Sequence, residues 1–366
     1  RCKGSAMEKV IDLSPVQRPK GNESAPWAKI ELKTRAAVAL ASVVPAAIAL
    51  AIFFATGIDF MAMLFAIFLP IQVVAAALVG ILVYGRRGIL EGLLVVVTIF
   101  FASFIVVLLF SVLWSVIDNG SRALSWQFIS QNNYYIKPNT SLDYGGVGHA
   151  IIGSLLIVGT ATIVTVPMGL ATAIYLTETQ GKTKGIIRTL LQAMSGLPSV
   201  VSGLFIYAAF IASGLTSYAG WTGSLALIPL MLPTVARVSE EALRLVPQEL
   251  RNGALALGAP AWRAFMLVTL PAARSGMVTA VLLGIARVIG ETAPLVLTTF
   301  AADRTNLNLF GGAMASLPTY LFGFISMGFD ESIQRAWGAA LVIMVLVAIL
   351  FTTARLASRT RSKARK

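Results

Sequence analysis

Residues 189–236 read TLLQAMSGLPSVVSGLFIYAAFIASGLTSYAGWTGSLALIPLMLPTVA and contain no charged residue over 48 positions. About 20 mostly apolar residues are needed to cross the hydrocarbon core of a membrane. In lipid, a helix satisfies all its backbone polar groups within one segment. Residues 213–220 are rich in Gly, Ser and Thr and interrupt the stretch. The stretch therefore predicts two membrane-spanning helices joined by a short turn.

Apolar blocks of similar length recur along the rest of the chain. Hydrophobic residues make up 57% of the sequence and charged residues 12%, about half the charged fraction of a soluble domain. The further blocks are residues 36–58, 60–85, 92–117, 150–177, 276–301 and 336–354. These blocks predict an all-α, polytopic membrane protein with eight spans. Residues 305–329 contain Asn, Gly and Pro, so we expect a surface or re-entrant segment there.

The net charge of +13 is unevenly distributed between the predicted loops. With eight spans and a cytoplasmic N-terminus, 24 Lys and Arg residues lie on the cytoplasmic side and four on the other side. This asymmetry follows the positive-inside rule. It argues against nucleic acid as a partner and makes acidic lipid headgroups the expected neighbours.

The predicted order is a polar cytoplasmic tail, an extra hairpin, a permease core and a basic cytoplasmic tail. These parts are residues 1–35, 36–85, 90–354 and 355–366, and the core contains a long cytoplasmic loop, 237–275. The first 35 residues lack the apolar core of a signal peptide, so we expect a disordered tail. A single Cys and a single His predict neither an internal disulfide nor a metal cluster.

One predicted span contains ionisable residues. Arg287 and Glu291 lie near the middle of residues 276–301, where an Arg costs about 2.5–3.5 kcal/mol on insertion scales. Their i,i+4 spacing predicts one shared helical face. They could form a structural ion pair that fixes helix packing. Alternatively, Arg287 faces a polar pathway and binds a passing anion, because guanidinium matches oxyanions bidentately.

The long cytoplasmic loop predicts two short helices outside the membrane. Pro247 suits a first helical turn, with Glu249 where the helix dipole favours an acid. Gly258 is placed to end this helix, and Pro260 then begins a second helix through Phe265. Such a pair forms a surface that a partner protein can bind.

This loop resembles the EAA loop of ABC-transporter permeases. The resemblance rests on Asn252-Gly253-Ala254, then Gly258, then Val268-Thr-Leu270-Pro271. In that family the loop forms the coupling helix, which lies in a groove of the ATPase subunit. Asn252 and Gly253 depart from the family's Glu and Ala, so Glu249 is the expected acidic contact.

A narrower resemblance rests on Ala286-Arg-Val-Ile-Gly-Glu-Thr-Ala-Pro-Leu295. This motif is similar to the signature of PstA-type permeases of the high-affinity phosphate ABC importer. The motifs in residues 166–176 and 197–205 agree with that family. The resemblance implies a type I ABC importer permease fold with six core spans. It also implies that Arg287, Glu291 and Thr292 line a phosphate path with Arg237 at its cytoplasmic mouth. Arg237 fits equally well as an anchor that follows the positive-inside rule.

The same resemblance implies the partners and the location. The partners are a PstC-type second permease, a PstB-type ATPase homodimer and a PstS-type extracytoplasmic phosphate-binding protein. The chain itself is then no enzyme and holds no cofactor, because ATP and Mg²⁺ are bound by the ATPase. The expected location is the bacterial inner membrane, with both termini cytoplasmic.

Other readings of the sequence stay open. The chain could be a secondary anion transporter, which needs its own coupling-ion site, or an ABC permease for another oxyanion. A membrane-embedded enzyme needs clustered His residues or an activated nucleophile, and the sequence contains neither pattern. Gly181-Lys182-Thr183 resembles the end of a P-loop, but Leu176 stands where that motif needs its first glycine.

Overall fold

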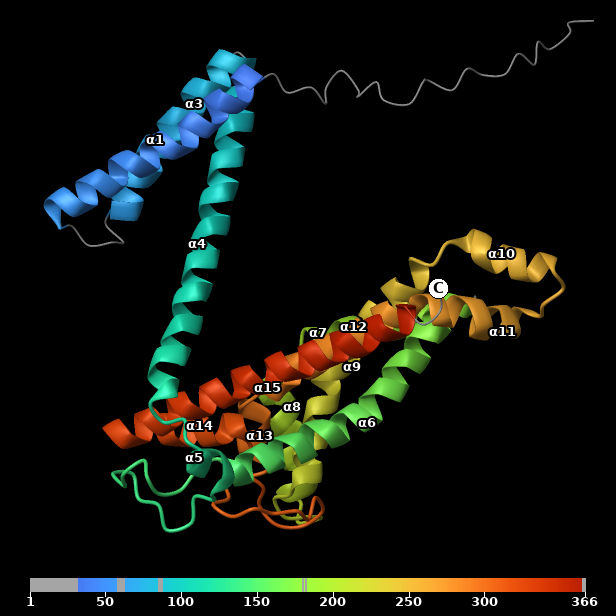
Figure 1. The fold of residues 1–366 in the computed structure, drawn as a ribbon. Helices are drawn as coiled ribbons and strands as arrows, with labels where there is room; N and C mark the ends of the chain where they lie inside the picture. The colour runs from blue at the N-terminus through green and yellow to red at the C-terminus, as the bar shows by residue number, and fades with distance from the viewer. Residues whose placement is uncertain (1–31, 58–62, 85–87, 180, 182, 364–366) are drawn as a thin grey trace, which may run out of the picture. The chain divides into compact units, whose positions relative to one another are not determined.

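Every regular element of the described residues is a helix in the computed structural model (Figure 1). The structure describes residues 32–57, 63–84, 88–179, 181 and 183–363. Most of the expected N-terminal tail lies outside these residues. The chain divides into two compact units, Arg1–Ser111 and Val112–Lys366, which we describe separately. The predicted all-α fold class is confirmed.

The first unit contains the expected hairpin. Helix α1 (Leu32–Thr56) packs against α3 (Leu69–Tyr84), which continues from the π-helical turn η2 (Met63–Phe68). Both helices carry large exposed apolar side chains, such as Phe54 and Val74. Exposed apolar side chains on a long apolar helix are expected where lipid is the solvent. Helix α4 (Gly88–Ser121) begins in this unit and ends in the second.

The second unit is a helical bundle built around α9. Its elements are α5 (Trp126–Ser130), α6 (Gly148–Glu178), α7 (Thr183–Ser195), α8 (Ser199–Ile206), η4 (Tyr207–Ile211), α9 (Gly220–Arg244), α10 (Gln248–Ala256), α11 (Ala261–Ala264), η5 (Phe265–Thr269), α12 (Leu270–Ile289), α13 (Ala293–Thr298), α14 (Leu317–Ile325) and α15 (Asp330–Lys363). The apolar window of α9 is 61% buried, against 33% for α6 and 17% for α12 and α15. Helix α9 is therefore the central helix, with α6 and α12 packed against it.

Small hydroxyl side chains bind the helices of the bundle to one another. The Ser224 hydroxyl of α9 donates to the Ile157 carbonyl of α6 at 2.9 Å, and Ser202 of α8 donates to the Ala226 carbonyl at 2.7 Å. In lipid there is no hydrophobic driving force for helices to associate, so close packing and such hydrogen bonds contribute more to helix association. These contacts fix α6 and α8 against α9.

The long helices qualify as spans by length and composition. Five of them in the described part of the chain are long and apolar enough, or six if the bent pair α7 and α8–η4 counts as one. In the hairpin, the apolar helices 43–56 and 63–79 are shorter and do not meet this length, so the count of eight stays a prediction. The pair bends by 98° at residues 196–198, because Pro198 disfavours a helical conformation at the preceding residue.

The predicted bounds of the span at 276–301 are wrong. Helix α12 ends at Ile289, and α13 begins separately at Ala293. Pro294 has no N–H to donate to the carbonyl four residues earlier, so an unbroken helix through this point would lose a hydrogen bond. The expected short segment within 305–329 contains only the nine-residue α14, which is too short to span.

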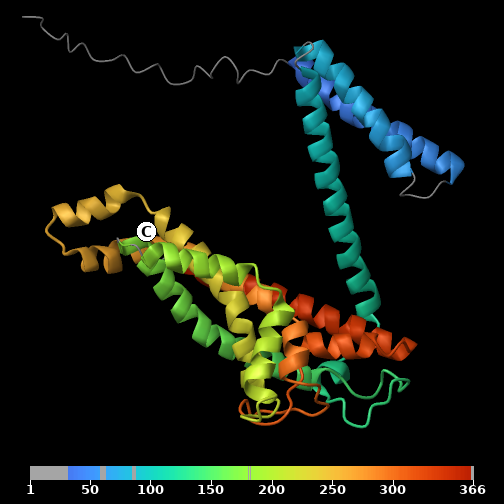
Figure 2. The ribbon, with the colours of Figure 1, turned by 180° about the vertical axis from the view of Figure 1, so that it is seen from behind.

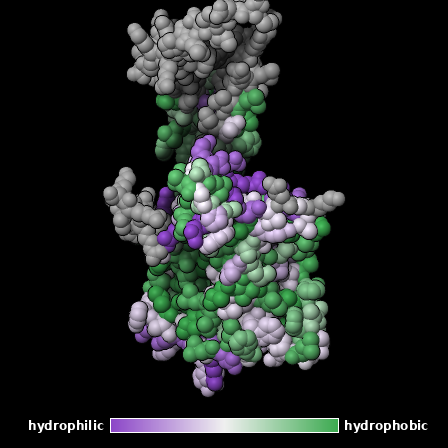
Figure 3. Space-filling model, turned by 90° about the vertical axis from the view of Figure 1, so that its right-hand side faces the viewer, coloured by the Kyte–Doolittle hydropathy of each residue, from purple (hydrophilic) through white to green (hydrophobic). Residues whose placement is uncertain are grey.

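The polar segments of the second unit lie at its two ends. Helices α10 and α11 are at one end, whereas α5 and the loop between α13 and α14 are at the other (Figures 1 and 2). On the face shown in Figure 3, hydrophobic residues form a band across the middle and hydrophilic residues lie above and below it. A band of this kind is what a membrane-embedded surface requires.

Close packing around Gly153 gives a test of the bundle. A Cβ at Gly153 of α6 would lie 1.9 Å from the Ala315 carbonyl oxygen, whereas a Cβ at Gly159 meets nothing within 4 Å. Overpacking typically costs about 1–3 kcal/mol, so Gly153→Ala should lower the thermal unfolding midpoint by several degrees. The measurement is tryptophan fluorescence of the purified chain in detergent. Gly159→Ala on the same helix is the control and should keep or raise the midpoint. Equal midpoints for both variants would contradict this packing.

Candidate functional site

The first candidate site lies at the break between α12 and α13. Gly290, Glu291 and Thr292 form the break between the two helices, and Glu291 and Thr292 are half-buried. Glu291 is thus outside α12, and the predicted shared helical face with Arg287 is wrong. No ion pair joins Arg287 and Glu291 in the described part of the chain. The alternative of a structural ion pair between these two residues is therefore not seen in the described residues.

Arg287 instead binds a neighbouring helix. It lies in the last turn of α12, is exposed, and donates from Nη1 to the Thr234 hydroxyl of α9 at 3.2 Å. A single neutral acceptor leaves most of the guanidinium's five donors free. Arg287 therefore keeps an unneutralised charge at the surface of this chain.

Arg237 lies on the same side of α9 as the acceptor of that bond. Thr234 and Arg237 are three residues apart on α9, a spacing that places two side chains on one helical face. Arg237 is exposed, like Arg287. The structure thus joins Arg287 of α12 to Thr234 of α9, and Arg237 lies one turn further along the same face of α9. Sequence reasoning missed Thr234, although its position one turn before Arg237 is a signal that could have found it.

The second candidate site is α10, the predicted coupling helix. Pro247 precedes its first residue, Glu249 lies in its first turn, and Gly258 follows its end with φ +85°, a left-handed conformation that favours glycine. None of its residues is buried. Asn252 and Gly253 are exposed and Ala254 is half-buried. The helix expected from the sequence is present, and it offers its whole outer face to a partner.

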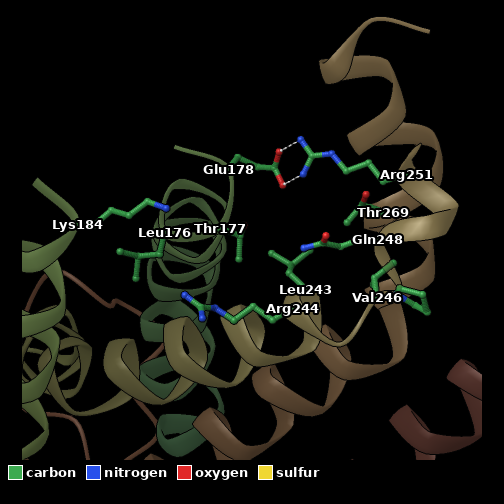
Figure 4. A pocket seen from close by; sticks show the side chains of 11 residues that line it. Leu176, Thr177, Glu178, Lys184, Leu243, Arg244, Val246, Gln248, Arg251 and Thr269 are labelled. Carbon is green, nitrogen blue, oxygen red and sulfur yellow. Dashed lines mark hydrogen bonds and ion pairs between the residues drawn. The ribbon is translucent and has the colours of Figure 1, made fainter. Parts of the chain in front are cut away.

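Three arginine–glutamate ion pairs hold the α10 end of the bundle together. Arg251 of α10 donates from Nη1 and Nη2 to the two carboxylate oxygens of Glu178, at 2.9 and 2.6 Å (Figure 4). Glu240 of α9 accepts from both Arg188 and Arg244, at 2.8 and 2.7 Å. The bidentate pair ties the exposed α10 to the end of α6.

The prediction of a second, separate short helix in the loop is wrong. Helix α11 begins after Pro260, as the sequence indicated, but continues through η5 into α12 without a stop. Together they form the 29-residue helix Ala261–Ile289. Leu270 and Pro271 therefore lie within a continuous helix, where Leu270 is half-buried and Pro271 is exposed. Pro271 fits because it stands at the second position of α12, after the π-helical turn.

Several residues of this end were not singled out from the sequence. These charged residues of the predicted cytoplasmic side are Glu178 of α6, Arg188 of α7, Glu240 and Arg244 of α9, and Arg251 of α10. From the sequence alone, each of them would be assigned to solvent. The partner of Arg188 lies 52 positions away in the sequence, and the partner of Arg251 lies 73 positions away. No local pattern connects positions so far apart. Among the described residues, no group of three His, Cys, Asp or Glu side chains could hold a metal ion.

Comparison with known proteins identifies the family. Residues 165–309 match the family described as "Binding-protein-dependent transport system inner membrane component". The chain is 37% identical over 265 residues to the phosphate transport system permease protein PstA 1 of Mycobacterium tuberculosis, covering 70% of this chain and 85% of that protein. It is 35% identical over 254 residues to PstA of Pasteurella multocida, covering 69% and 88%.

A third relative is PstA of Mycobacterium leprae, 42% identical over 205 residues, with 56% of this chain and 67% of that protein covered. Among solved structures, an amino acid ABC transporter has a TM-score of 0.47 at 18% identity and covers 58% of this chain and 92% of that one. The several apolar helices make this a multi-pass membrane protein. The chain belongs to the PstA family of phosphate transport system permease proteins.

Proposed function

We propose that this chain is the permease subunit of an ATP-driven importer of inorganic phosphate and forms half of its translocation pathway. The observation that carries the proposal is Arg287, an exposed guanidinium beside the break between α12 and α13 that has no carboxylate partner among the residues the structure describes. An unpaired charge within a span is costly unless it lines a pathway. The relatives' names as phosphate permeases support phosphate as the anion.

The chemistry of this surface suits an oxyanion. Arg287 offers free N–H donors in a planar fork, which binds phosphate oxygens bidentately. Thr234 adds a hydroxyl, and Arg237 adds a second cation on the same face of α9. Glu291 and Thr292 lie in the adjacent break. The carboxylate of Glu291 would keep the affinity for the anion modest, so that phosphate can leave.

The exposed face of Arg287 implies a second wall for the pathway. We assign that wall to a PstC-type permease, and the exposed α10 with its Glu249, Asn252, Gly253 and Ala254 to contact with a PstB-type ATPase homodimer. Substrate would arrive on a PstS-type binding protein. ATP and Mg²⁺ would be bound by the ATPase, so this chain needs no cofactor of its own. The basic α10 end and both termini would face the cytoplasm of a bacterium, by the positive-inside rule.

The test is reconstitution with the cognate ATPase, second permease and binding protein in liposomes. Radiolabelled phosphate uptake should require ATP inside and binding protein outside, and a hydrolysis-deficient ATPase is the matched control. Uptake that persists without ATP and follows an ion gradient would instead identify a secondary transporter. Excess sulfate that competes as well as unlabelled phosphate would identify a permease for another oxyanion.

A further inference from the structure

A cavity lies beside α10, at the end of the bundle away from α5. It has a volume of about 280 Å³, close to the lower bound of roughly 300 Å³ for small-molecule sites. Its walls come from the end of α6, the start of α7, the end of α9, the start of α10 and η5 (Figure 4). Five elements that meet at one cavity form a site where a small ligand can act on all of them.

Cations dominate the wall of this cavity. Lys184, Arg244 and Arg251 line it, against one carboxylate, Glu178. Both oxygens of Glu178 accept from Arg251, so this carboxylate is already neutralised. Arg244 shares Glu240 with Arg188, which leaves one positive charge in excess in that group. Lys184 has no carboxylate within ion-pair distance among the described residues. The cavity therefore carries a net positive charge.

Thr269 is an independent observation that points to a ligand. This residue of η5 is only 6% exposed, and its buried hydroxyl has no hydrogen-bond partner among the described residues. A buried hydroxyl without a partner costs about 1–3 kcal/mol in protein mutational data. In Figure 4 the Thr269 side chain extends into the space bounded by Arg251 and Gln248. A ligand oxygen in the cavity would give this hydroxyl the partner that the chain does not supply.

We propose that this cavity binds a phosphoryl oxyanion, supplied either as free inorganic phosphate or as the headgroup of an acidic lipid. Lys184 and Arg244 supply the charge, and the Gln248 amide and the Thr269 hydroxyl donate to the remaining oxygens. Gln248 and Arg251 belong to α10, so an occupied site holds α10 against the ends of α6 and α9. The site uses none of the residues of the Arg287 surface, and its occupancy regulates the mobility of the coupling helix.

The experiment measures hydrogen exchange of the backbone amides of residues 248–256 in the purified full chain. The chain is held in zwitterionic phosphatidylcholine nanodiscs, with inorganic phosphate or chloride at equal ionic strength. Phosphate should slow exchange in α10 several-fold relative to chloride. Lys184→Gln should raise the phosphate concentration needed by about tenfold, the size of a lost charge-assisted hydrogen bond. Thr269→Val should weaken the effect with little loss of folding, because the removed hydroxyl has no partner in the part of the chain that the structure describes.

Three comparisons make the outcome specific. Arg263→Gln removes an exposed cation from α11, outside the cavity, and should leave the phosphate effect unchanged. Arg287→Gln should also leave it unchanged, which separates this site from the proposed transport pathway. In a second set of nanodiscs without free phosphate, anionic phosphatidylglycerol that slows exchange in a Lys184-dependent way would assign the oxyanion to lipid.

Three results would overturn the proposal. One is α10 exchange that responds to neither phosphate nor anionic lipid. A second is an effect lost equally in Arg263→Gln and Lys184→Gln, which would show general charge screening at this end of the protein. If only the Arg287→Gln variant lost the effect, phosphate would be acting through the pathway, and the cavity would carry no site.

Discussion

Replacing Arg287 by glutamine should reduce phosphate uptake by about 100-fold or more while leaving the protein folded. The guanidinium is exposed, and its described contact is one 3.2 Å hydrogen bond to Thr234, which glutamine can replace in part. What glutamine cannot replace is the charge and the bidentate fork. Charge-assisted hydrogen bonds are worth about 1.5–3 kcal/mol each, so losing two of them on the transported anion costs roughly two or more powers of ten.

The controls separate a pathway role from a structural one. Arg274→Gln removes an exposed charge from the same helix, α12, and should transport normally. Arg287→Lys keeps the charge without the fork and should retain partial uptake. All variants are compared by phosphate uptake and by thermal unfolding midpoint. If Arg287→Gln lost uptake and stability together, Arg287 would be a packing residue, and normal uptake would remove it from the pathway.

Placing aspartates on α10 should release the ATPase subunit from the membrane. Leu250 is 51% exposed and Leu257 is 91% exposed, so neither contributes much to the fold of this chain. Burying a leucine at an interface contributes about 1.5–3 kcal/mol. The double substitution Leu250→Asp and Leu257→Asp should thus weaken ATPase binding by roughly a thousandfold. The measurement is the amount of ATPase that co-purifies with the permease in detergent.

The matched control for this variant lies at the opposite end of the bundle. Leu215, in the turn before α9, is 75% exposed, and Leu215→Asp should leave ATPase binding unchanged. Equal amounts of membrane-extracted permease in all three samples exclude a folding defect. If the full amount of ATPase co-purified with the Leu250→Asp, Leu257→Asp double variant, the ATPase would bind another surface.

Local properties of the chain predicted much of its architecture. The apolar blocks located α6, α9 and α15, because helix length and hydropathy are properties of consecutive residues. Gly258 was correctly expected to end α10, since few residues adopt φ near +85° as readily as glycine. The break before α13 was harder to predict. Pro294 is present in the sequence, but a proline inside a span does not always end the helix, and Pro167 lies within the continuous α6.

Arg335 illustrates what the sequence could not reveal. Counted from the sequence, it is one of four cations on the less basic side. In the structure it is fully buried in α15, and its Nη2 donates to the carbonyls of Thr140, Ser141 and Tyr144. Backbone carbonyls nearly 200 positions away satisfy part of a charge that would otherwise be too costly to bury. Arg335 thereby anchors the loop before α6 to the start of α15.

By itself, the sequence determined that this is a polytopic helical membrane protein with one charged span and an exposed short helix in its longest predicted cytoplasmic loop. Those features depend on composition and on spacings of a few residues. Only the tertiary structure showed that Glu291 lies outside the helix that contains Arg287, and that Arg287 donates to Thr234 instead of pairing with Glu291. Only the tertiary structure likewise showed that Arg251 binds Glu178. These pairings, and the cavity beside them, depend on which helix ends meet in space. Packing between helices determines which ends meet, and the sequence pattern of a single helix does not predict that packing.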